Sequence, residues 1–321
     1  IDGMHFSFPH RVLASCVAAL LLVGSAPLFA QPGESLPDPP PPDEPVSDTA
    51  NADWAYDVLA RLNASQAAYK DWKEGGGNNS LAFTAALGGA AEKKGERWAQ
   101  AHELRLVFGI IDQANQELRK AEDQIRVSTN LQYQGEDFFK VFNPTAAINL
   151  RTQFASGFEY DSNPFEQDSV LAAQEPPVET SAFLAPAFIT ESIGLTYEPA
   201  DWMSIRMGAA SKQTVVIEED FRELYGVDAN KVARVEAGAE LASSVNYSFT
   251  ENIQYRSQLD VFFSFNQLED PPDVLWENRI NLKVNSWLST DLEFVALYDK
   301  STTDAIQLKE TISLGVSFSL I

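Results

Sequence analysis

The C-terminal part of the chain, residues 231–321, alternates between apolar and polar side chains. In its last segment the apolar positions are Ile306, Leu308, Ile312, Leu314, Val316, Phe318 and Leu320. A period of two predicts a β-strand, because successive side chains of a strand point to opposite faces. The three preceding segments repeat the pattern. Consecutive strands with one apolar and one polar face are typical of a transmembrane β-barrel.

The same periodicity extends over most of the chain and predicts about twelve strands. They lie at approximately residues 55–70, 79–91, 97–110, 123–134, 145–159, 181–198, 202–212, 231–249, 252–265, 274–287, 290–300 and 305–320. The second and third are rich in alanine and have weak strand propensity, and residues 112–124 could equally form a short helix. We therefore expect an all-β fold, a closed antiparallel transmembrane β-barrel of about twelve strands.

The connections between these strands provide an independent test, because outer-membrane barrels alternate short periplasmic turns with longer outer loops. If the first strand begins in the periplasm, the periplasmic turns follow the even-numbered strands. The short segments 92–95, 198–201, 249–252 and 288–291 agree with this alternation, whereas residues 135–144 are longer than expected. The longest outer connections are residues 159–180, which are rich in acids, and residues 212–230.

Aromatic residues support the same prediction. The six tryptophans, Trp54, Trp72, Trp98, Trp202, Trp276 and Trp287, fall at or near the ends of predicted strands. Membrane barrels carry aromatic girdles at both interfaces, although tryptophans also pack against turns in soluble proteins. Trp287 lies on the inward face of its strand, so not every ring is expected to contact lipid.

The N-terminal residues are predicted to lie outside the barrel. Residues 1–30 resemble a secretory signal peptide, with residues 1–3 upstream of it, because an apolar run follows Arg11 and precedes Ala30. An uncleaved membrane helix is the alternative. Residues 31–51 are rich in proline and acids and predict a disordered periplasmic tether. The barrel then occupies residues 52–321, in the outer membrane of a Gram-negative-type bacterium.

Composition limits the partners. The formal net charge of −23 makes nucleic acid an unexpected partner, because its phosphates would be repelled. The single cysteine, Cys16, lies in the predicted signal, so neither a disulfide nor a thiolate metal site is expected. No cofactor is indicated. The expected partners are outer-membrane lipid and lipopolysaccharide, together with the barrel-assembly machinery, which reads a final strand with apolar residues such as Phe318. The sequence does not indicate the oligomeric state.

Catalysis is not indicated either, and we expect the protein not to be an enzyme. After the predicted signal the chain has one histidine, His102, and Leu104 stands two residues later, where the outer-membrane phospholipase has its serine. His102 is therefore predicted to be an interfacial residue near the periplasmic rim. The three glycines at 75–77 are not followed by the Lys-Ser/Thr of a phosphate-binding loop.

The inward faces carry the candidate functional residues. Strand parity predicts a lumen lined by Arg105, Arg126, Arg151, Arg234, Glu236, Glu240, Arg256, Asp260, Glu277, Arg279, Lys283 and Glu293. These side chains either neutralise one another and plug a small barrel, which would leave a structural or envelope-interaction role, or they line a narrow pore that prefers anions. A soluble periplasmic β-domain and an outer-membrane lipid enzyme are the remaining alternatives.

One charged residue, Glu191, falls on the apolar face of its predicted strand. Either a β-bulge shifts the register of that strand, or Glu191 sits above the bilayer.

Several short segments resemble a known family. They are residues 72–80 (WKEGGGNNS), 181–186 (SAFLAP), 192–199 (SIGLTYEP), 225–227 (YGV) and 297–299 (LYD), with Lys309 and Glu310. They are similar to an uncharacterised family of bacterial envelope proteins, the domain-of-unknown-function family 3078, over roughly residues 54–320. The resemblance implies a cell-envelope barrel and supplies no catalytic or binding residue.

Overall fold

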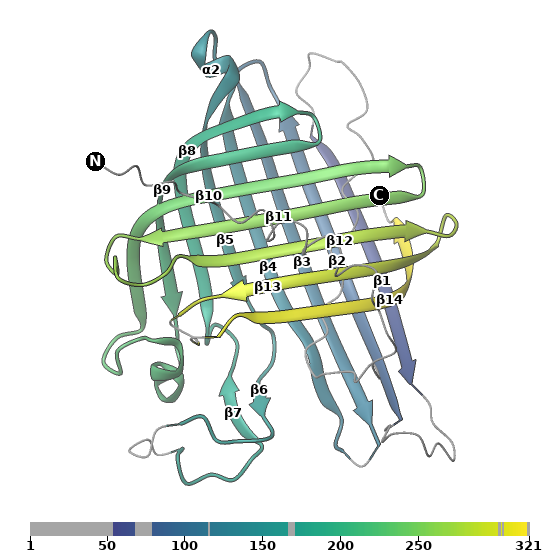
Figure 1. The fold of residues 1–321 in the computed structure, drawn as a ribbon, viewed down its shortest axis with the longest axis vertical. Helices are drawn as coiled ribbons and strands as arrows, with labels where there is room; N and C mark the ends of the chain where they lie inside the picture. Colours follow the sequence, from purple (N-terminus) through teal and green to yellow (C-terminus); the bar gives the residue numbers. More distant parts are fainter. Residues whose placement is uncertain are drawn as a thin grey trace, which may run out of the picture.

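In the computed structural model, which describes residues 54–67, 79–114, 116–165, 171–300, 303 and 305–319, the chain forms a closed antiparallel barrel (Figure 1). The barrel strands are β1 (Ala55–Ala67), β2 (Ser80–Lys94), β3 (Trp98–Gln113), β4 (Arg119–Tyr133), β5 (Phe142–Thr152), β8 (Ala187–Ala200), β9 (Met203–Val215), β10 (Ala233–Thr250), β11 (Ile253–Ser264), β12 (Asp273–Lys283), β13 (Leu288–Tyr298) and β14 (Gln307–Ser319). Each strand pairs with its neighbours in sequence, and β1 closes the barrel against β14. The predicted twelve-stranded barrel is confirmed.

The strand boundaries differ from the prediction in two places. The fifth strand ends at Thr152 and the sixth begins at Ala187, because part of the intervening segment forms a separate hairpin of β6 (Gly157–Glu159) and β7 (Val178–Ser181). Residues 112–124 contain no helix among the described positions, and β4 already begins at Arg119. The predicted signal peptide and tether, residues 1–51, and the glycines at 75–77 lie outside the described residues.

The two faces of the wall have opposite character. Large apolar side chains such as Leu62, Ile148 and Leu314 are exposed on the outside. Alternate positions point inward and include buried charged groups such as Arg61, Glu240 and Asp291. A soluble barrel would bury the apolar set and expose the polar one. The observed distribution is that of a transmembrane β-barrel, which is surrounded by lipid and holds its polar groups inside.

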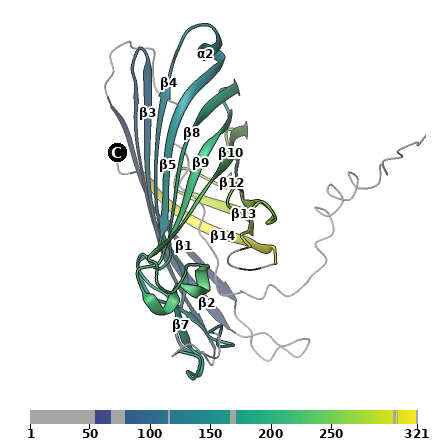
Figure 2. The same ribbon diagram turned by 90° about the vertical axis from the view of Figure 1, so that its left-hand side faces the viewer.

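The connections differ between the two ends of the barrel, as the sequence predicts. At one end, called here the short-turn end, β2–β3, β8–β9, β10–β11 and β12–β13 are joined by brief turns. The β4–β5 connection is longer there because it contains α2 (Phe138–Val141). The opposite long-loop end carries β6, β7 and the 3-10 helices η1 (Glu219–Phe221) and η2 (Glu223–Tyr225). Figure 2 shows β3, β4, β5, β8 and β9 spreading apart towards the short-turn end.

Aromatic rings follow one another around the short-turn end. The ring pairs include Trp54–Tyr56, Trp98–Tyr133, Phe142–Tyr197, Trp202–Tyr247 and Phe249–Tyr255, with centroids 5.1–6.4 Å apart. Four of the five described tryptophans lie at this end, and Trp276 is near the long-loop end of β12. Trp72 lies outside the described residues. These rings form the aromatic belt expected where a barrel meets the polar edge of a membrane.

Within the described residues, no helix is both long and apolar enough to cross a membrane.

Candidate functional site: the ion-paired lumen

The lumen is crossed by an arginine–glutamate pair. Arg126 of β4 donates two hydrogen bonds to Glu277 of β12, at 3.0 and 3.1 Å. Five strands separate β4 from β12 in either direction around the barrel, so these two strands stand on opposite walls. A bidentate pair of two ionised groups has well-defined geometry and is stronger than a neutral hydrogen bond. The opposite walls therefore approach within the reach of two side chains at this level.

Charges of each sign are grouped on opposite walls around this pair. Arg105, Arg126 and Arg151 are direct cross-strand partners on β3, β4 and β5. The facing wall carries a diagonal row of carboxylates, Glu240, Asp260, Glu277 and Glu293, one on each strand from β10 to β13. The arginine row and the carboxylate row therefore face each other across the lumen, although Arg256 and Arg279 lie on the same strands as two of the carboxylates.

A second group of charges lies deep against β13. Arg61 donates to Asp291 at 3.1 Å, and Asn281 donates to the other oxygen of Asp291 at 2.7 Å. Arg279 lies 3.8 Å from Glu293. All four charged side chains are buried. Each carboxylate therefore faces a cation, as groups withdrawn from water must.

The long-loop mouth is crossed by lysine bridges. Lys212 of β9 donates to Asp273 of β12 at 2.6 Å and to Asp299, just after β13, at 2.7 Å. Lys309 of β14 donates to Glu122 of β4 at 3.4 Å. Because these partners come from strands that are not neighbours, the bridges run over the opening rather than along the wall.

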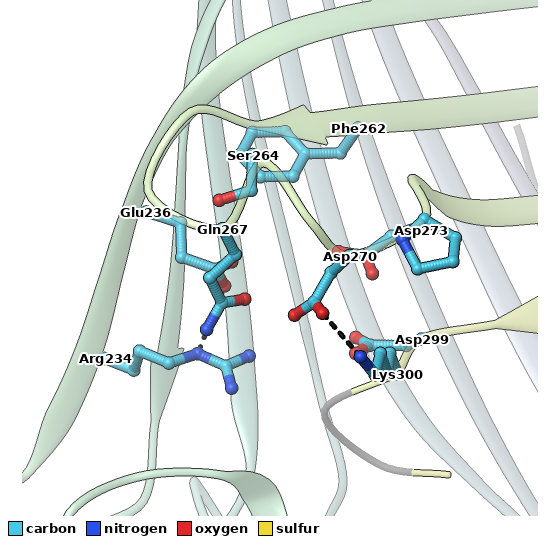
Figure 3. Close-up of a pocket in the computed structure, with 10 residues that line it drawn as sticks. Arg234, Glu236, Phe262, Ser264, Gln267, Asp270, Asp273, Asp299 and Lys300 are labelled. Atoms are coloured by element: carbon cyan, nitrogen blue, oxygen red, sulfur yellow. Dashed lines mark hydrogen bonds and ion pairs between the residues drawn. The ribbon is translucent and has the colours of Figure 1, made fainter. Parts of the chain in front are cut away.

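A small pocket remains beside these bridges (Figure 3). It is lined by Arg234, Glu236, Phe262, Ser264, Gln267, Asp270, Pro271, Asp273, Asp299 and Lys300. Arg234 pairs with Glu236 at 3.1 Å, and Lys300 pairs with Asp270. The pocket lining is therefore acidic, with four carboxylates and two cations, and its other two carboxylates, Asp273 and Asp299, share Lys212. Among the described residues, no group of three or more His, Cys, Asp or Glu side chains is arranged to hold a metal ion.

The twelve residues predicted to line the lumen occupy different environments. Arg105, Glu236, Glu240, Arg279 and Glu293 are buried, whereas Lys283 is exposed at the short-turn end. The guanidinium of Arg151 lies 4.9 Å from the ring of Phe188.

Arg206 of β9, which was not among the twelve, also connects the two walls. It donates a hydrogen bond to Glu240 at 3.1 Å and another to Asn130 of β4 at 3.1 Å.

Three participants in the mouth bridges lay at the predicted strand boundaries. Lys212 was the last residue of a predicted strand, and Glu122 and Asp273 each stood one residue before one, whereas all three lie within strands, β9, β4 and β12. The period-two pattern does indicate that Lys212 points inward, because Lys212 and the inward Arg206 lie an even number of positions apart on the same strand. No comparable signal in the sequence indicates which carboxylates it contacts.

Water reaches part of the lumen. Glu103 and Gln258 have inward parity on β3 and β11, and both are exposed. Arg105, two residues further along β3 towards the long-loop end, is buried. The accessible part of the lumen therefore opens towards the short-turn end, where the strands spread apart (Figure 2).

His102 lies outside the lumen, near the short-turn end. Its ring lies 5.5 Å from that of Trp54, and its Nδ1 is 3.2 Å from the hydroxyl of Thr129. These contacts agree with the predicted interfacial position.

Glu191 also points outward, and the suggestion of a β-bulge at this residue is wrong. β8 pairs continuously with β5 through Ile148–Glu191 and with β9 through Glu191–Ser211. The register shift on β8 lies further along, between Tyr197 and Ala200.

The two longest described loops form an ordered cap at the long-loop end. Ala185, Val216, Phe221 and Val227 make a small buried apolar cluster, with Phe165, Leu171, Ala182 and Tyr225 packed against it. The hydroxyl of Tyr225 donates to the carbonyl of Thr180 at 3.1 Å. Burial raises the pKa of Tyr225, and a hydrogen bond with Ser181 opposes this effect. Two of the segments that carry the family resemblance, 181–186 and 225–227, thus pack together in this cap.

Comparison with known proteins supports the resemblance. Residues 64–158 match the model of the family described as "Protein of unknown function (DUF3078)". The expected family resemblance is confirmed. The matched DUF3078 segment is shorter than the predicted span and runs from the end of β1 to β6. No curated protein matches the sequence.

Solved structures with a similar fold are outer-membrane barrels. The translocator domain of the autotransporter NalP from Neisseria meningitidis matches with a TM-score of 0.37 and 8% identity, over 83% of this chain and 87% of that one. An outer membrane channel from Pseudomonas putida F1 matches with a TM-score of 0.38 and 10% identity, over 85% and 96%. The channel DcaP of Acinetobacter baumannii matches with a TM-score of 0.30 and 10% identity, over 86% and 99%. These similarities are too distant to transfer a function.

Proposed function

We propose that this protein is an outer-membrane β-barrel whose lumen is held closed by ion pairs, and that it has a structural or interaction role in the envelope. The observation that carries the proposal is the Arg126–Glu277 pair between opposite walls. In the proposed closed state this pair obstructs the lumen, and its separation would leave charges without their partners in a confined space. The lysine bridges at the long-loop mouth add a second barrier in series.

The membrane location is supported by the exposed apolar wall and by the aromatic belt at the short-turn end. Cell fractionation tests it directly. The protein should stay with the outer-membrane fraction after washing with salt or carbonate, and should show the heat-dependent gel mobility of a folded barrel. Recovery in the soluble periplasmic fraction would overturn the proposal.

Conductance tests the closed lumen. Purified protein in a planar bilayer should give no stable current steps, while a known porin in the same bilayer does. Insertion is checked separately by flotation of the barrel with lipid vesicles. Regular current steps from inserted wild-type protein would refute a closed lumen.

A narrow anion-preferring pore is the second candidate, and the row Arg105, Arg126 and Arg151 favours it. Three guanidinium groups on one wall would attract anions into the lumen. If the wild type conducts, a salt gradient should show anion preference, and neutralising Arg151, whose guanidinium lies over the ring of Phe188, should reduce that preference without closing the pore. Unchanged selectivity in the Arg151→Gln variant would remove this candidate.

A further inference from the structure

A group of polar side chains lies on the outside of the barrel, on the wall formed by β8, β9 and β10, which run side by side in Figure 1. Gln213 donates to Glu191 at 3.3 Å and to Ser211 at 3.1 Å. Glu191 and Ser211 are direct cross-strand partners. Glu191 is exposed, so its carboxylate faces the surroundings of the barrel rather than its interior.

The depth of Glu191 makes this group unusual. Tyr197, on the same strand, belongs to the aromatic belt, and only six positions separate it from Glu191. A strand needs about 9–11 residues to cross the apolar layer. Glu191 therefore lies within the apolar layer rather than above it. Ionised groups at this depth are costly when they face lipid, and their presence indicates a functional contact.

Two other polar groups on the outer wall, Ser257 and Asn278, are hydrogen-bonded by aromatic residues of the barrel itself. Trp276 donates to Ser257 at 3.0 Å, and the hydroxyl of Tyr255 donates to Asn278 at 2.8 Å. Glu310 points outward on β14, but it lies only three residues from the start of that strand at the long-loop end. Glu191 has no aromatic cover of this kind, and it lies four residues from the start of β8.

On the surface around Glu191, one protruding side chain, Ile193, lies beside a row of small residues. The cross-strand row Ile193–Ala209–Ala239 lies next to the row Glu191–Ser211–Ala237. Four of these six side chains are alanine or serine, so they form a shallow hollow across β9 and β10. Ile193 beside it is 75% exposed, which makes it one of the most exposed apolar residues of the wall. Small residues allow two membrane segments to approach closely.

We propose that the wall of β8, β9 and β10 binds the same wall of a second copy of this chain in the membrane. The surface is self-complementary in two ways. Ile193 of each copy fits the alanine and serine hollow of the other. Gln213 keeps one N–H on Glu191 of its own chain and turns the N–H that it donates to Ser211 towards Glu191 of the other copy. A two-fold axis along the membrane normal keeps each of these residues at the same depth in both copies, as a symmetric dimer requires. The inference rests on the proposed membrane location.

Cysteine cross-linking tests the proposal directly, because residues 17–321 contain no cysteine. The Ser211→Cys variant in native outer membranes should form a disulfide-linked dimer after mild oxidation. The control is Leu314→Cys, which is exposed on β14. Five strands separate β14 from β8 in either direction, so Leu314 faces away from the proposed contact and should give little dimer.

Three outcomes of this experiment would overturn the proposal. They are the absence of an adduct at Ser211, equal dimer formation at both positions, and an adduct at Ser211 with a different protein. Heat-dependent gel mobility and membrane fractionation are measured on the same samples. Failure of dimer formation in a correctly inserted barrel would therefore be distinguished from failure of the membrane location.

Paired substitutions then test the two parts of the interface. Ala209→Phe fills the hollow, while Ala85→Phe adds the same ring at an exposed alanine of β2. Glu191→Leu removes the carboxylate, while Glu310→Leu removes the outward carboxylate on the opposite wall. Starting from Ser211→Cys, the changes at 209 and 191 should reduce the cross-linked fraction at least tenfold, and the changes at 85 and 310 should leave it unchanged. Equal effects within either pair would contradict the assigned surface.

Discussion

Arg61 on β1 and Asp291 on β13 form a 3.1 Å ion pair in which each side chain is at most 3% exposed. β14 lies between their strands, so the pair joins two strands that share no backbone hydrogen bonds. Asn281 adds a hydrogen bond to the same carboxylate. The pair therefore links β1, which closes the barrel against β14, to β13 on the other side of β14.

Removing the carboxylate of this pair should destabilise the barrel. Asp291→Ala leaves Arg61 buried without its anion, and we expect a loss of about 3–5 kcal/mol in the free energy of unfolding. Urea unfolding of the protein in lipid vesicles measures it. The control is Asp270→Ala at the exposed Lys300–Asp270 pair, which should cost at most about 1 kcal/mol. Equal losses would show that burial does not determine the contribution of the Arg61–Asp291 pair.

Glu277→Gln should open a current path through a closed lumen. The change removes the anionic partner of Arg126 and leaves the row Arg105, Arg126 and Arg151 without the acid that crosses the lumen. We expect current steps with anion preference in planar bilayers, because the remaining local charge is positive. The control Asp270→Asn changes a carboxylate at the mouth and should stay non-conducting. A silent Glu277→Gln barrel would show that the other bridges suffice for closure.

Gly194→Ala should impair folding. A Cβ at Gly194 would lie 2.1 Å from the carbonyl oxygen of Met207 and 2.6 Å from the Cα of Gly208, both backbone atoms of β9. The strands β8 and β9 would have to separate, so we expect a lower yield of the heat-modifiable folded band and a loss of about 1–3 kcal/mol in unfolding free energy. At Gly89 a Cβ meets nothing within 4 Å. Gly89→Ala should therefore fold normally, and matching defects in both variants would refute the steric explanation.

Val227→Asp should open the loop cap while leaving the barrel intact. Val227 is buried in the apolar cluster of the cap, and an uncompensated carboxylate there is costly. We expect faster proteolytic cleavage within residues 216–232, with unchanged heat-dependent mobility of the barrel, because locally unfolded loops are the segments that proteases reach. Val232→Asp, at a position that is 51% exposed, serves as the control. Cleavage at the wild-type rate in Val227→Asp would mean that the cluster does not order the loops.

Most of the fold could be predicted from the sequence, because a strand in a membrane barrel alternates lipid-facing and lumen-facing residues. The strand that contains Phe318 and the one that contains Phe263 both show this pattern, and the structure contains both. The exceptions were the loops that form ordered structure of their own. Residues 153–186 contain β6, β7 and part of the cap, whose order depends on contacts with residues 216–232 that periodicity does not reveal.

The sequence by itself determined that the chain forms about twelve two-faced strands and that charged side chains point inward, because both properties follow from a local period of two. Only the tertiary structure decided which charges meet. Arg126 and Glu277 are 151 positions apart and come together because closure of the barrel places β4 opposite β12. The register and tilt of all the intervening strands fix that meeting. Parity along a single strand contains no information about it.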